Sequence, residues 1–146
     1  MARIRRYLGR VEVWLDDRER SALLHSVEAL RDAAVAMRPH AYDDSELEDE
    51  YQRYSAPAVG ELHAADLATV CADLGGNPHP LRLDEERALA WLRALNVLRL
   101  TAGGKLGIEK DGWEESAVVG PGQEETWSMF LDLGWVQEGI LAALEG

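Results

Sequence analysis

The chain has 146 residues, 47% of them hydrophobic and 29% charged, which is typical of one globular domain spanning residues 1–146. Its 15 lysines and arginines face 27 aspartates and glutamates, giving a formal net charge of −12. This charge repels phosphate backbones and anionic lipids, so composition disfavours nucleic acid and membrane surfaces as partners.

The N-terminal residues predict a β-hairpin over 4–15. Two short runs, 4–8 and 11–15, are rich in branched and aromatic residues and are joined at Gly9-Arg10. An isolated hairpin is marginally stable in water, so we expect it to pack on helices through Val11, Val13 or Leu15. Four arginines crowd this segment and an acidic run occupies 43–50, so the arginines have two candidate contacts, an acidic partner or this chain's own acidic run.

Helical spacing of apolar residues predicts three helices in the first half of the chain. The first covers 17–37, preceded by Asp16 and Glu19 in the arrangement of a capping box. A short acidic helix over 44–54 and a longer helix over 60–74 follow, the last one ending at a Gly-Gly-Asn-Pro sequence.

The most strongly patterned segment predicts a central helix over 84–106. Asp84 is placed to cap it, and apolar residues then occupy most of the helix circumference. A last helix over 123–144 contains Gly134 and Gly139, which favour close approach of a neighbouring backbone or a locally weak helix. We therefore expect a mainly α fold, a bundle of four to five helices around the central one, with the small N-terminal β-hairpin.

The segment RLTAGGKLGI, residues 99–108, has a glycine pair followed by lysine, like a phosphate-binding loop. That motif needs an earlier glycine where Arg99 stands, a hydroxyl where Leu106 stands, and a preceding strand. Helical spacing continues through the segment instead, and Gly107 suits the left-handed residue that ends many helices. We interpret it as a helix C-terminus.

No catalytic or metal-binding constellation is recognisable. His63, Asp66 and His79 are the best candidates for a metal or acid–base site, but no HExxH or paired-cysteine element accompanies them, so ordinary structural roles are favoured. Cys71 is the single cysteine; it excludes an internal disulfide and is interpreted as a small buried hydrophobic residue. We expect no cofactor and no metal.

Three residues are candidates for interaction. Trp113 lies in a charged loop, where an exposed tryptophan would anchor a protein interface; folding back over the core is the favoured alternative. Asn96 and Arg99 lie on a narrow polar stripe of the central helix. They are candidates for a ligand site, although Arg99 is expected to pair with an acidic side chain across the bundle.

Two blocks of sequence resemble the actinobacterial domain-of-unknown-function family 2017. They are GRVEVWLDDRERSALL near the start, and AWLRALNVLRLTAGGKLGI with ETWSMFLDLGWVQEGIL in the second half. The family pattern corresponds to Trp91, Leu92, Asn96, Leu98, Arg99 and Leu100, with Val97 at a position that is often acidic. The resemblance implies a small helical cytosolic protein, often labelled a transcriptional regulator and encoded near a proteolytic adaptor and an isopeptidase; it implies no catalytic residues.

These observations predict a cytoplasmic, non-enzymatic regulatory protein that acts through contacts with an unidentified protein partner, with a role in transcription as one form of this function. The first alternative is a small-molecule or metal-dependent enzyme that uses Asn96 and Arg99. An adaptor linked to regulated proteolysis is the next alternative. Homo-oligomerisation through exposed apolar faces is a further alternative that one sequence does not decide.

The N-terminus lacks the apolar run of a secretory signal, and no stretch is long and apolar enough to cross a membrane.

Overall fold

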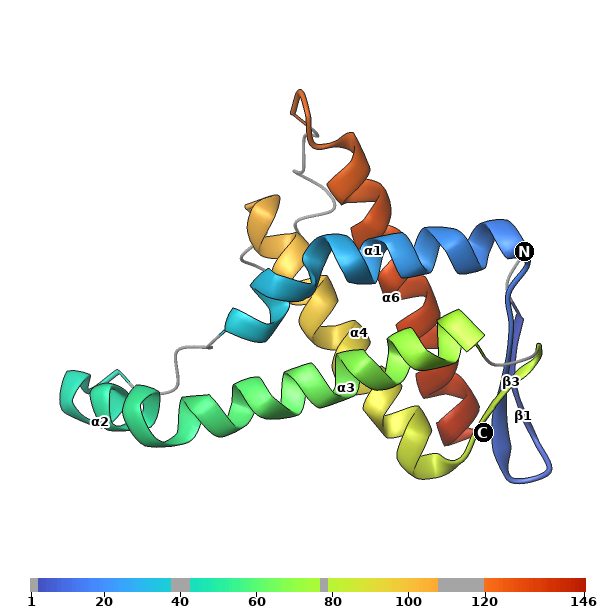
Figure 1. Cartoon of the computed structure of the whole chain (residues 1–146), viewed down its shortest axis with the longest axis horizontal. Coiled ribbons are helices and arrows are strands. Elements are labelled where there is room, and N and C mark those ends of the chain that lie inside the picture. Colours follow the sequence, from blue (N-terminus) through green and yellow to red (C-terminus); the bar gives the residue numbers. More distant parts are fainter. Residues whose placement is uncertain (1–2, 38–42, 77–78, 108–119) are drawn as a thin grey trace.

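The computed structural model describes residues 3–37, 43–76, 79–107 and 120–146. The fold is mainly α with an N-terminal β-hairpin, as predicted (Figure 1). Its elements in chain order are β1 (Arg3–Tyr7), β2 (Arg10–Trp14), α1 (Asp17–Ala36), α2 (Ser45–Glu50), the π-helical turn η1 (Tyr51–Ser55), α3 (Ala56–Gly76), β3 (Leu81–Leu83), α4 (Glu85–Lys105) and α6 (Glu124–Glu145).

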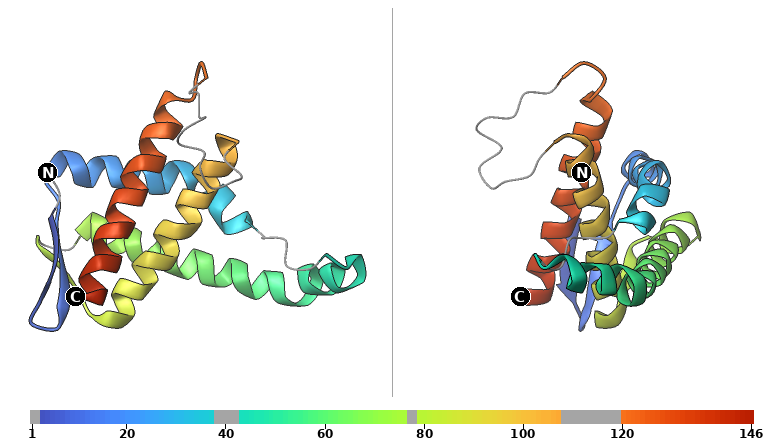
Figure 2. Two further views of the ribbon diagram at one scale, coloured as in Figure 1. Left: turned by 180° about the vertical axis from the view of Figure 1, so that it is seen from behind. Right: turned by 90° about the vertical axis from the view of Figure 1, so that its left-hand side faces the viewer.

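Helix α4 is the centre of the bundle, which confirms the prediction for 84–106. It packs against α6, α3 and α1, and the two views of Figure 2 show these helices around it. Trp91, Leu95 and Leu98 are completely buried. A helix that is apolar on most sides needs neighbours on most sides, and α4 has them.

Both ends of α4 are closed as the sequence predicts. The Asp84 side chain accepts a hydrogen bond from the backbone N–H of Arg87 at 2.8 Å. At the other end Gly107 has a φ of 75°, and its N–H donates to the carbonyl of Gly104. The segment with the glycine pair is therefore the last turn of a helix and its left-handed terminator.

The hairpin is part of a three-stranded antiparallel sheet in the order β1-β2-β3. Leu8 and Gly9, both with positive φ, form the turn between β1 and β2. Val11 pairs with Leu83 and Val13 with Leu81, and all four side chains are buried toward the helices. The sequence analysis missed β3, because three residues are too few to show a strand pattern.

The predicted helices 44–54 and 60–74 form one continuous helical stretch through α2, η1 and α3. Pro57 lies within the predicted break, residues 55–59. Proline has no N–H, and its ring crowds the carbonyl four residues earlier, which interrupts an ordinary α-helix. The wider π turn before it, where the N–H of Ala56 donates to the carbonyl of Tyr51, lets the helix continue.

The two glycines of α6 make room for side chains of neighbouring elements rather than for another backbone. A Cβ at Gly139 would lie 2.7 Å from Cδ1 of Ile4, so this glycine lets β1 rest on α6. A Cβ at Gly134 would lie 3.1 Å from Nε of Arg99. Arg6 adds a tie from β1 to α6, because its guanidinium donates to the carbonyl of Leu144 at 3.0 Å.

Candidate functional site

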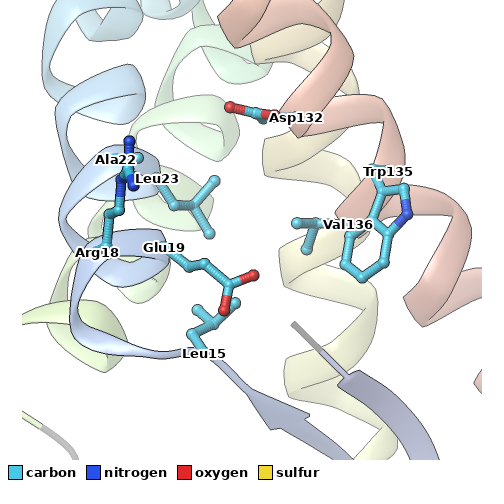
Figure 3. A pocket seen from close by; sticks show the side chains of 8 residues that line it. All are labelled: Leu15, Arg18, Glu19, Ala22, Leu23, Asp132, Trp135 and Val136. Carbon is cyan, nitrogen blue, oxygen red and sulfur yellow. The ribbon is translucent and has the colours of Figure 1, made fainter. Parts of the chain in front are cut away.

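The candidate site is a groove between the first turns of α1 and the middle of α6 (Figure 3). Its volume is about 380 Å³. Three buried apolar side chains, Leu15, Leu23 and Val136, point into it, and its remaining lining residues are Arg18, Glu19, Ala22, Asp132 and Trp135. The groove therefore has an apolar floor and a charged rim.

Local sequence explains how these side chains meet. The capping box fixes the start of α1 directly after β2: the N–H of Glu19 donates to Asp16 at 2.7 Å, and the Glu19 carboxylate accepts from the N–H of Asp16 at 3.1 Å. This predicted cap holds Leu15 against the first turns of α1. On the opposite wall, Asp132 and Val136 are four residues apart in α6 and so share one helix face.

Trp135 is the most prominent residue of the site. Its exposed fraction is 45%, which is high for a side chain of this size. It also lines a second hollow on the side of β1, together with Arg3, Ile4, Arg5, Glu138 and Gly139. The indole thus separates two hollows, an arrangement typical of an aromatic contact residue rather than of a core residue.

The electrostatics of the rim favour a cationic neighbour. Partial burial raises the pKa of Asp132, because the apolar walls remove water from its carboxylate. Glu19 lines the groove from the facing helix, with its carboxylate near Leu15 and away from Asp132 (Figure 3), and Arg18 is the cation of the rim. A positively charged group placed beside Asp132 would stabilise its ionised form.

Of the interaction candidates named in the sequence, the structure describes Asn96 and Arg99, which lie one turn apart on α4 and outside the groove. Trp113 lies outside the described residues. Asn96 is exposed and accepts a hydrogen bond from Nε2 of Gln137 at 3.3 Å. Neither Asn96 nor Arg99 lines the groove.

Among the described residues, Arg99 has no ion pair with an acidic side chain, so the predicted pairing stays a prediction. Its guanidinium lies over the ring of Phe130, 5.0 Å from the centroid, and against Gly134. Its Nε is buried and has no hydrogen-bond partner among the described residues. The missing side chain of Gly134 and the face of Phe130 provide a cation–π site in place of a carboxylate.

The histidines that the structure describes and Cys71 do not converge on a site. Asp66 is occupied by Arg93, whose Nε donates to it at 2.9 Å, so it is not free to work with His63. Burial, and next the nearby Arg20, lower the pKa of His79. Among the described residues no three potential metal ligands come together. Cys71 is half-buried beside the core rather than fully buried.

A family model described as "Domain of unknown function (DUF2017)" matches residues 1–144. The chain belongs to this family. Searches of curated proteins and of solved structures each gave no match. The DUF2017 assignment confirms the resemblance seen in the sequence, and because the family's description states no activity, the groove has to be interpreted from its own geometry. In the described part of the chain, no helix is both long and apolar enough to span a bilayer.

Sequence reasoning missed the groove as a site. In the linear sequence, Trp135 is one more apolar residue among those of α6. The signal that distinguishes it is position, since it follows Asp132 by three residues and therefore lies on a charged flank of the helix. The groove exists only because α1 packs beside that face of α6, and this packing cannot be read from the sequence.

Proposed function

We propose that this protein is a non-enzymatic regulatory protein that binds a protein partner in the groove beside Trp135. The observation that carries the proposal is a half-exposed tryptophan next to a buried apolar floor. Tryptophan is enriched among the residues that dominate binding energy at protein interfaces, especially next to apolar pockets. The charged rim suits the polar border that surrounds such contacts.

The partner is proposed to present one large apolar side chain flanked by a basic residue. A groove of about 380 Å³ accommodates such a side chain. A lysine or arginine beside it would meet the carboxylate of Asp132. Because the groove contains no nucleophile–base pair, its geometry supports docking better than catalysis.

The more specific forms of this function remain proposals that rest on the family resemblance. They are a role in transcription, exerted through protein contacts rather than direct contacts to DNA, and a link to regulated proteolysis as an adaptor. A cytoplasmic location fits either form. Both forms use the same property, a surface that recognises another protein.

The test is a comparative pull-down from the native host with three versions of the chain as bait. We expect the wild type to recover a specific partner and Trp135→Ala to lose at least about tenfold of it, the loss of binding typical of a dominant contact residue. Leu141→Ala is the matched control, because Leu141 is equally exposed on α6, at 46%, but does not line the groove. Equal recovery by wild type and Trp135→Ala would contradict the proposal.

A further inference from the structure

The outer face of the sheet is a basic surface with two aromatic residues. Strand alternation places Val11 and Val13 toward the helices, and their neighbours in β2 on the opposite, outer face of the sheet. The pairing registers carry this alternation into β1 and β3. The outer face consists of Arg3, Arg5, Tyr7, Arg10, Glu12, Trp14 and Arg82.

This face carries positive charge on a chain whose net charge is strongly negative. Glu12 is only 2% exposed, and it accepts from Arg5 at 2.9 Å and from Arg82 at 3.3 Å. All four arginines of the face are nevertheless exposed. Four guanidinium groups against one carboxylate leave three net positive charges there.

Aromatic rings hold two of these arginines in place. The Arg5 guanidinium lies over Tyr7, 4.7 Å from the ring centroid, and Arg3 lies over Trp14 at 5.7 Å. A guanidinium group that is stacked on a ring still has N–H donors available for a carboxylate. Its side chain has already lost part of its conformational freedom before any partner binds. The face is therefore partly organised to receive an anionic surface.

The matching anionic surface is on the same chain but is out of reach of this sheet. Residues 43–50 carry six carboxylates within eight positions, most of them on α2. The contacts of α2 are mainly with η1, and Figure 1 shows α2 and the sheet at opposite ends of the longest axis of the molecule. The pairing of the arginines with this chain's own acidic run, one alternative from the sequence, is therefore excluded within one copy.

We propose that the outer face of the sheet docks the acidic helix α2 of a second copy of this chain. Charge complementarity supports this occupant. Apolar contacts add to it, because α2 and η1 expose Leu47 and Tyr54 while the hairpin exposes Tyr7 and Leu8. A contact between different surfaces of two copies is a head-to-tail contact, which builds chains unless the rotation closes a ring.

The first test measures self-association by sedimentation at low and high salt. We expect the wild type to associate as its concentration rises, and this association to disappear at about 1 M salt, where the screening length falls to about 3 Å. The sheet variant Arg3→Glu/Arg10→Glu leaves the arginines bonded to Glu12 in place. The helix variant Asp43→Lys/Asp49→Lys/Glu50→Lys leaves the capping residue Asp44 in place.

Each variant is expected to weaken self-association by at least about tenfold, because several exposed charge pairs become repulsive together. Glu28→Lys/Asp32→Lys/Glu61→Lys is the matched control, since it makes the same charge change at exposed positions of α1 and α3. It should associate at least as well as the wild type.

Mixing the two defective variants is the decisive step. The sheet variant retains an intact acidic helix and the helix variant retains an intact sheet face, so an equal mixture should form a one-to-one complex. A monomeric wild type, association that resists salt, or a mixture that stays monomeric would overturn the proposal. So would a monomeric wild type whose sheet face binds single-stranded RNA instead.

Discussion

Replacing Asp73 with alanine is expected to lower the free energy of unfolding by about 3–5 kcal/mol, because it removes an arginine–carboxylate pair and leaves a buried indole N–H without an acceptor. Asp73 is fully buried on α3 and accepts from the Arg87 guanidinium at 2.7–3.0 Å. It also accepts from the indole N–H of Trp91 at 2.8 Å. The substitution leaves the buried indole N–H without an acceptor and removes the hydrogen bonds that link α3 to α4.

Asp66→Ala is the matched control for this prediction. Asp66 is also buried on α3 and is held by one arginine, Arg93, whose side chain is 48% exposed. Arg93 can turn to water, as can Arg87, whose side chain is 43% exposed. The two variants therefore differ in the hydrogen bond from the buried indole, which Asp66→Ala does not remove, and we expect a smaller loss of about 1–3 kcal/mol. Urea denaturation followed by circular dichroism measures both variants, and equal losses would contradict the role given to Trp91.

Trp91→Ala is expected to cost about 3–5 kcal/mol, the range for removing a large aromatic side chain from a packed core. The Trp91 side chain is fully buried in α4, the helix that every other long helix contacts. The cavity left behind lies between α3 and α4, where neighbouring side chains are themselves fully buried and have little room to collapse inward.

Trp135→Ala is the matched control for the loss of stability expected from Trp91→Ala. Trp135 is 45% exposed and borders a groove, so its removal should cost much less stability while abolishing partner recovery. Thermal unfolding of both variants in one buffer provides the measurement. Similar losses at the two positions would show that Trp135 is a structural residue, and the proposed site would be wrong.

The sequence was sufficient for most of the helical framework because each signal is local. The capping box at Asp16, the cap at Asp84 and the left-handed Gly107 all depend on residues within one helical turn. The buried face of α4 follows from its apolar pattern alone. These features are decided before any tertiary contact is known.

The features that the sequence did not predict depend on residues far apart in the chain. Strand β3 forms because Leu81 and Leu83 meet Val13 and Val11, which lie about 70 residues earlier. Arg99 finds a glycine and an aromatic ring where a carboxylate was expected. The continuous helix through 45–76 depends on a π turn, for which no sequence pattern was available.

The candidate site belongs to this second group. Its floor combines Leu15 and Leu23 with Val136, and its key residue, Trp135, is recognised by its exposure beside that floor. Trp113, the tryptophan singled out by its unusual sequence context, lies outside the described residues. The sequence therefore singled out Trp113 by its context, whereas Trp135 was recognised as a site residue only from the packing around it.

Site-specific photo-crosslinking in the native host tests the central claim most directly. A benzophenone side chain placed at Arg18 lies on the rim of the groove, and one placed at Glu61 lies on an exposed turn of α3. We expect a crosslink to one other protein from position 18, lost when Trp135→Ala is added, and none to that protein from position 61. No crosslink from position 18, or the same crosslinks from both positions, would contradict the proposed site.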